Sequence, residues 1–130
     1  MKSNLFIIIF IAAAVIIYSS LVLAFTATFT WTPTVSSTAT GYNLYMTTSS
    51  GSYTYGGAAS PNYVTSVSGG SSNTYQQTGI LAGSYFWVMT SIDGAGDESG
   101  PSNQVTCTFP GPTCIFSLSG ISIGGGTTIK

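Results

Sequence analysis

The sequence predicts an all-β protein, a sandwich of two packed sheets that follows an N-terminal hydrophobic segment. Beyond residue 24, runs rich in Thr, Tyr, Val, Phe and Trp alternate with clusters of Gly, Ser, Pro and Asn, and no stretch has helical periodicity. The spacing of the runs suits a sandwich. We expect strands near residues 26–32, 41–48, 63–67, 73–77, 85–92, 103–109 and 114–123.

Residues 1–24 form the first of three predicted regions. Lys2 precedes an uncharged apolar run, and the smaller residues that follow place Val22 and Ala24 at the two positions that signal peptidase inspects. This order is typical of a secretory signal peptide and predicts a protein that is secreted or held at the cell surface. A retained hydrophobic helix is the alternative, since about twenty apolar residues can cross a bilayer. Membrane contact would then involve residues 1–24 alone.

Charge is scarce throughout the chain, which has five charged side chains in 130 residues and neither His nor Arg. Nucleic acid is excluded as a partner, because phosphate binding depends on Lys and Arg. The sequence also offers no nucleophile paired with a base and no cluster of metal ligands, so we expect neither an enzyme nor a cofactor. A surface with so little charge favours self-association.

Two further regions follow the leader, a sandwich over residues 25–109 and a tail over residues 110–130. Cys107 and Cys114 stand on either side of their junction, with Pro110 and Gly111 between them. A turn there could bring the sulfurs together, and an exported protein permits a disulfide. We expect this pair to clamp the root of the tail, with free thiols as the alternative.

Five stretches of the sandwich region resemble the fibronectin type III family. In order and spacing they are similar to its B, C, E and F strands and its F–G loop, across about residues 26–109. The stretches are Phe29–Pro33, Thr40–Tyr45, Tyr75–Ile80, Tyr85–Asp93 and Asp97–Asn103.

The resemblance implies an immunoglobulin-like β-sandwich with a core around Trp31, with Tyr42 and Leu44 pointing inward and Tyr85 at the corner between the E and F strands. Alternation along a strand independently places Tyr85 and Trp87 on one face, and we expect that face to be buried.

The chain departs from the family at both ends. Only Phe25 and Thr26 stand where a first strand of some ten residues should lie, and an extra strand follows residue 109. Cys114, Phe116 and Leu118 share one face, whereas Ile121 and Ile123 have the opposite parity, so we expect a bulge at Gly120 that brings these residues to one side. The residues expected to contact a neighbouring subunit through this strand are Ile115, Phe116, Leu118, Ile121 and Ile123.

A sandwich without its first strand leaves a groove with unpaired backbone groups, and the extra strand could fill it. The tail either folds into its own domain or enters the groove of the next subunit. The second arrangement, repeated head to tail, gives a filament. Phe86, Val88 and Ile92 should lie on the outer face of their strand, where a cover by another subunit or by the tail would explain their apolar character.

The acidic residues are confined to one loop, which holds Asp93, Asp97 and Glu98. They are weak candidates for calcium ligands, since carboxylates are hard ligands. The alternative is that this loop resembles the F–G loop of the family, where such residues shape the turn.

Two functions of different classes follow. The first is a structural subunit of an extracellular filament or surface assembly, built by strand complementation between copies of the chain. The second is a secreted or membrane-anchored monomer that binds carbohydrate or a surface protein, because the loop over residues 49–57 carries Tyr53 and Tyr55 among small residues.

Overall fold

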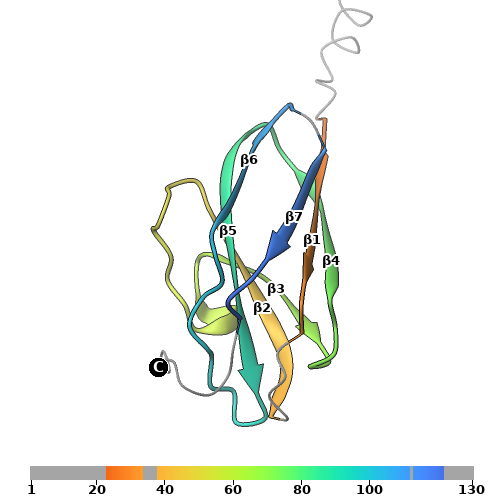
Figure 1. Cartoon of the computed structure of the whole chain (residues 1–130). Coiled ribbons are helices and arrows are strands. Elements are labelled where there is room, and N and C mark those ends of the chain that lie inside the picture. The colour runs from red at the N-terminus through yellow and green to blue at the C-terminus, as the bar shows by residue number, and fades with distance from the viewer. Residues whose placement is uncertain (1–22, 34–37, 112, 122–130) are drawn as a thin grey trace, which may run out of the picture.

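Seven strands form two sheets that pack face to face in the computed structural model, which describes residues 23–33, 38–111 and 113–121 (Figure 1). One sheet has the order β4-β1-β7 and the other the order β3-β2-β5-β6. The predicted all-β sandwich is confirmed. The strands are β1 (Phe25–Trp31), β2 (Ala39–Thr47), β3 (Tyr63–Ser68), β4 (Thr74–Ile80), β5 (Gly83–Asp93), β6 (Val105–Phe109) and β7 (Cys114–Leu118), with a short 3₁₀ turn η1 (Gly57–Ala59).

The hydrophobic leader lies almost wholly outside the described residues, which begin at Leu23. Within the described part of the chain, no helix has the length and apolar character needed to cross a membrane.

Alternating side chains of both sheets fill the core. Phe29 of β1 meets Trp87 of β5 edge to face at 5.6 Å, and Trp31 meets Tyr42 of β2 at 5.2 Å. Such offset aromatic pairs contribute stabilisation beyond the area they bury. Trp31, Tyr42, Leu44 and Trp87 are buried, and Tyr85 is partly buried against them.

The tail enters its own domain. β7 lies parallel to β1, with Ala27 opposite Cys114 and Trp31 opposite Leu118, and so occupies the side of β1 where the sequence predicted an open groove. The strand ends at Leu118, earlier than the predicted residue 123.

Gly120 accounts for the change of parity in the tail. Its φ of +79° is a left-handed conformation that glycine adopts without steric cost. The turn returns Ile121 to the core, where it is only 8% exposed. Ile123 lies outside the described residues.

Candidate functional site

The outer face of the four-stranded sheet is covered by the segment between β2 and β3, residues 48–62. Val88 of β5 is 3% exposed, and Phe86 and Ile92 are partly buried. Val88 lies opposite Tyr45, whose ring contacts Tyr55 of the covering segment at 5.2 Å. The apolar face predicted for β5 is therefore shielded within the domain, by this segment rather than by the tail.

Gln104, just before β6, fastens the far end of this segment. Its Oε1 accepts hydrogen bonds from the Gly51 amide at 2.9 Å and the Tyr53 hydroxyl at 3.2 Å, and its Nε2 donates to Ser50. The segment is thereby tied across the sheet instead of projecting from it.

Four tyrosines gather beneath and within the covering segment. Tyr45 lies between Tyr55 and Tyr63, with ring centroids at 5.2 and 6.2 Å, and Tyr53 stacks on Tyr55 at 6.2 Å. Burial raises the pKa of Tyr53 and Tyr55 above the ordinary tyrosine value. Burial, and then the hydrogen bond to Glu98, raises the pKa of Tyr45 to about 12.

Glu98 is the buried acceptor at the centre of this region, and its side chain is 6% exposed. The Tyr45 hydroxyl donates to both carboxylate oxygens, at 2.6 and 2.7 Å. Thr90 donates to Oε2 at 2.8 Å, and Asn43 and the Gly57 amide donate to Oε1 at 2.9 and 2.8 Å. A carboxylate has about four lone-pair sites, so these donors satisfy the buried group. Glu98 thus binds the loop after β5 to β2 and η1.

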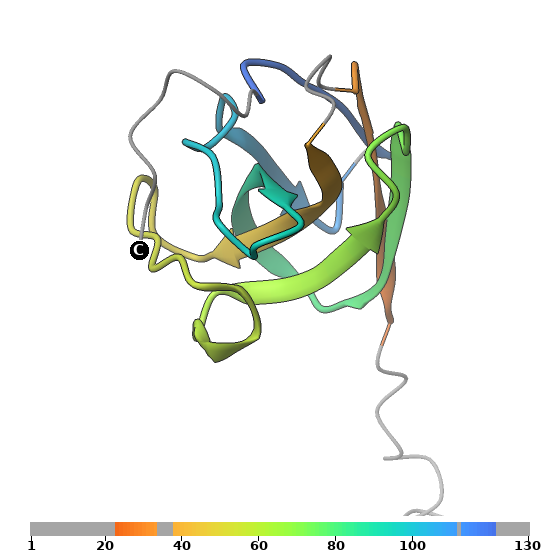
Figure 2. The same cartoon turned by 90° about the horizontal axis from the view of Figure 1, so that it is seen from below.

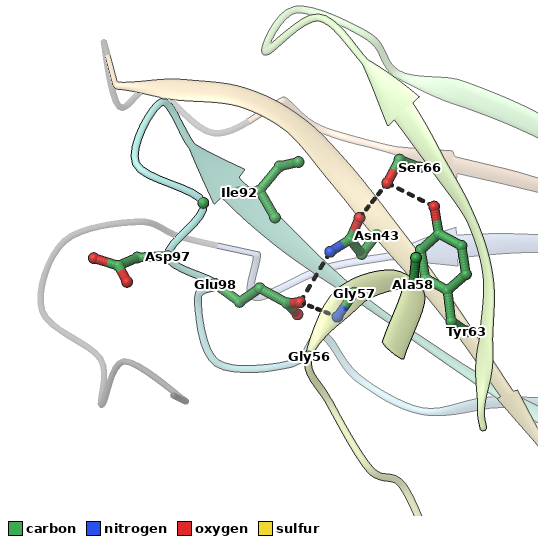
Figure 3. Close-up of a pocket in the computed structure, with 10 residues that line it drawn as sticks. Asn43, Gly56, Gly57, Ala58, Tyr63, Ser66, Ile92, Asp97 and Glu98 are labelled. Carbon is green, nitrogen blue, oxygen red and sulfur yellow. Dashed lines mark hydrogen bonds between the residues drawn. The ribbon is translucent and has the colours of Figure 1, made fainter. Parts of the chain in front are cut away.

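A pocket of about 350 Å³ opens beside Glu98 (Figure 3). Its walls are η1, β3, Asn43 of β2 and the turn after β5. The Tyr63 hydroxyl donates to Ser66 at 2.9 Å, and Ser66 donates in turn to Asn43, so a chain of hydrogen bonds runs along one wall to Glu98. The pocket combines an aromatic ring with ordered polar groups.

Asp93, which ends β5, and the two acids of the loop after it have different surroundings. Asp93 accepts hydrogen bonds from the Ala95 and Asp97 amides at 2.9 and 3.0 Å, and so shapes the turn. The Asp97 side chain is exposed and points away from Glu98 (Figure 3). No group of three or more His, Cys, Asp or Glu residues placed to hold a metal ion occurs within the described ranges.

A disulfide joins Cys107 of β6 to Cys114 of β7, with 6.2 Å between their Cα atoms. It links the two sheets, and it holds the first residue of β7 beside its own β6. A strand pinned at this point can reach another copy only from Ile115 onward.

All four edge strands of the sandwich lack charge. They are β4 and β7 in one sheet and β3 and β6 in the other, and none contains Asp, Glu, Lys or Arg. The described residues include no Lys or Arg at all, because the two lysines are Lys2 and Lys130. Ile115 of β7 is 69% exposed.

No family model matches this chain, and no significant match occurs among the curated proteins or the solved structures.

Sequence reasoning missed the network around Glu98. Alternation along β2 was a usable signal, because it sends Asn43 and Tyr45 to the face opposite Tyr42 and Leu44. A buried tyrosine on an outer face needs a hydrogen-bond partner. The sequence did not show that Glu98, about fifty positions further along, would turn inward to meet it.

Proposed function

We propose that this protein is a structural subunit of an extracellular assembly, made from copies of the same chain. The observation that carries the proposal is the absence of charge from all four edge strands. Natural sheets guard their edges with charged residues, above all Lys, because an open edge pairs readily with another chain. Edges left unguarded in a stable domain suit a protein whose edges are meant to be occupied.

Two features support an exported location. The Cys107–Cys114 disulfide is of a kind that forms in oxidising compartments. The first 24 residues follow the pattern of a secretory signal peptide. A fibronectin type III-like domain, which the five sequence stretches suggest, is in keeping with a surface role. A charge-poor exterior also loses little solvation when it is buried against a neighbour.

Strand complementation between subunits stays a prediction. β7 fills the groove beside β1 within the chain, and the disulfide retains its first residue there. Exchange of β7 would require the rest of the strand, from Ile115 onward, to leave its place and enter another copy. Contact through the edges requires no such rearrangement, so the present geometry supports it better.

Sedimentation of the exported protein tests the proposal. We expect large assemblies that persist on dilution and are visible by electron microscopy. A protein that remains monomeric at high concentration would refute the structural role.

Binding of carbohydrate is a second candidate function, favoured by the pocket and the tyrosines beside it. A panel of neutral oligosaccharides, titrated by calorimetry, would test it. Tyr63→Ala should weaken binding about tenfold or more if its ring contacts a sugar, whereas Thr78→Ala, at an exposed position of the other sheet, should leave the affinity unchanged.

A further inference from the structure

We propose that neighbouring copies lie side by side, related by translation together with the rotation that sheet twist requires, so that β7 of one copy pairs with β4 of the next while β6 pairs with β3. This inference rests on the proposed structural role and specifies its interface. The partner is a second copy of this chain, and the contact extends both sheets at once.

Strand direction supports this arrangement. β1 is antiparallel to β4 and parallel to β7, so the two edges of this sheet run in opposite directions. β2 is antiparallel to β3 and β5, and β5 is antiparallel to β6, so the edges of the second sheet also run in opposite directions. Translation keeps the direction of every strand unchanged apart from the twist between neighbouring strands. Both new pairs would therefore be antiparallel, which is the more stable and more common pairing.

The edge strands also lie in the pairs that this contact requires, β3 with β4 on one side of the sandwich and β6 with β7 on the other. β3 is joined to β4 by residues 69–73, and β6 is joined to β7 by residues 110–113, so each connection carries the chain from one sheet to the other (Figure 2). The sandwich consequently has one side bounded by β3 and β4 and one bounded by β6 and β7. A single contact brings these two sides together.

The parallel placement of β7 makes this possible. If β7 ran antiparallel to β1, both edges of the three-stranded sheet would have the same direction, and translated copies would meet there with parallel strands. The tail therefore does more than close the groove. It also gives the three-stranded sheet an edge strand that runs opposite to β4, so that repeated copies can pair in the antiparallel manner.

The side chains at these edges present no electrostatic obstacle. β7 exposes Ile115 and Ser117, and β4 exposes Thr74, Gln76 and Thr78. Uncharged hydroxyl, amide and aliphatic groups of this kind pack well across antiparallel strands. The contact is heterologous, so it leaves a free edge at each end and grows into an open filament.

A two-fold dimer is the competing geometry, in which each edge meets its own copy, β7 against β7. Such a dimer occupies only one side of the sandwich, and a second, different interface would be needed to occupy the other. Translation pairs all four edge strands with strands of neighbouring copies through one kind of contact.

Disulfide cross-linking in the intact assembly separates these arrangements. Ser117→Cys on β7 is combined in one chain with Thr74→Cys, Gln76→Cys or Thr78→Cys on β4, so that the three double variants sample the register. Opposed Cβ atoms in antiparallel strands lie about 4.5–5.5 Å apart, near enough for a disulfide after a small adjustment. We expect at least one double variant to give a ladder of covalent multimers on oxidation, and each single variant to give none.

Two results would overturn the inference while leaving the structural role intact. Assemblies could form without any double variant giving a ladder, or Ser117→Cys alone could give covalent dimers, which a two-fold contact predicts. A chain that forms no assembly, with native tyrosine and tryptophan circular dichroism, would instead remove the structural role and this interface together.

Discussion

Glu98 is the residue on which the outer face of the four-stranded sheet depends. Its carboxylate receives donors from β2, β5 and η1, and the described chain provides no cation to neutralise it. Hydrogen bonds to a charged group contribute more than those between neutral groups, and an unsatisfied buried donor is costly. Glu98 therefore holds the η1 end of the covering segment, while Gln104 holds its far end.

We predict that Glu98→Gln lowers the free energy of unfolding by about 2–3 kcal/mol, because an amide nitrogen replaces an acceptor that faces Tyr45 or Asn43. Urea denaturation measures the change. Asp97→Asn is the matched control, and its exposed side chain should change stability by no more than about 0.5 kcal/mol. Equal effects of the two substitutions would contradict the role given to Glu98.

Tyr45 makes the stability of the fold depend on pH in the alkaline range. Its pKa is raised from 10.0, the value of an unperturbed tyrosine, to about 12 in the folded protein, first by burial and then by Glu98. The unfolded chain therefore releases this proton at lower pH than the folded one. The stabilising contribution is complete below about pH 10 and is lost as the pH rises through about 12.

Urea unfolding between about pH 8 and pH 12 checks this expectation, together with ultraviolet titration of tyrosine ionisation. Tyr45→Phe should be less stable at neutral pH but should lose less stability on going to high pH. A wild-type protein whose unfolding free energy stays constant between about pH 10 and pH 12 would contradict the prediction.

At the scale of elements, β7 contributes one face to the core and the other to the exterior. Leu118 is 2% exposed, whereas Ile115 in the same strand is 69% exposed. We predict that Leu118→Ala costs about 2–4 kcal/mol, since it leaves a cavity in the core, while Ile115→Ala stays within about 0.5 kcal/mol. Chemical denaturation of the two variants tests whether Leu118, but not Ile115, lies in a core in solution.

The disulfide should hold β7 in place. The chain-entropy model gives about 2.5 kcal/mol for a loop as short as that between Cys107 and Cys114, which are separated by 7 positions. We expect the Cys107→Ser/Cys114→Ser double variant to unfold at a lower urea concentration than the wild type. Its amide exchange rates should rise above those of the wild type, and the rise should be larger in β7 than in β2. Unchanged exchange in β7 would contradict this role.

The sequence predicted the strands well and their pairing poorly. Alternation along β5 correctly separated Trp87 from Val88, because side chains of successive residues leave a strand on opposite faces. Alternation carries no information about which edge a strand joins or in which direction, so the parallel placement of β7 could not be predicted. Nor could the network at Glu98, since its partners come from segments far apart in the sequence.

At the scale of the whole molecule, the scarcity of charge leaves the edges of the sandwich open to contact with other copies. Within the described ranges the only charges are the three acids of one loop, and the edges are neutral. A lysine introduced at an edge should therefore restore the protection that the natural sequence lacks.

We predict that Ile115→Lys raises the protein concentration needed for assembly about tenfold or more, because a lysine on an edge strand opposes pairing with another chain. Ser52→Lys is the control of equal net charge, placed at an exposed position of the covering segment, and should assemble like the wild type. Light scattering across a concentration series measures both. Equal inhibition by the two variants would point to net charge rather than to the β7 edge.

The most direct test of edge-joined assembly is a cryo-electron microscopy map of the protein taken from its own cells, at a resolution that traces each strand. The account predicts that β7 remains beside its own β1 and that β4 of the next copy lies antiparallel on its free side. A map with β7 lodged in the groove of a neighbour, or with the β7 and β4 edges both free, would contradict it.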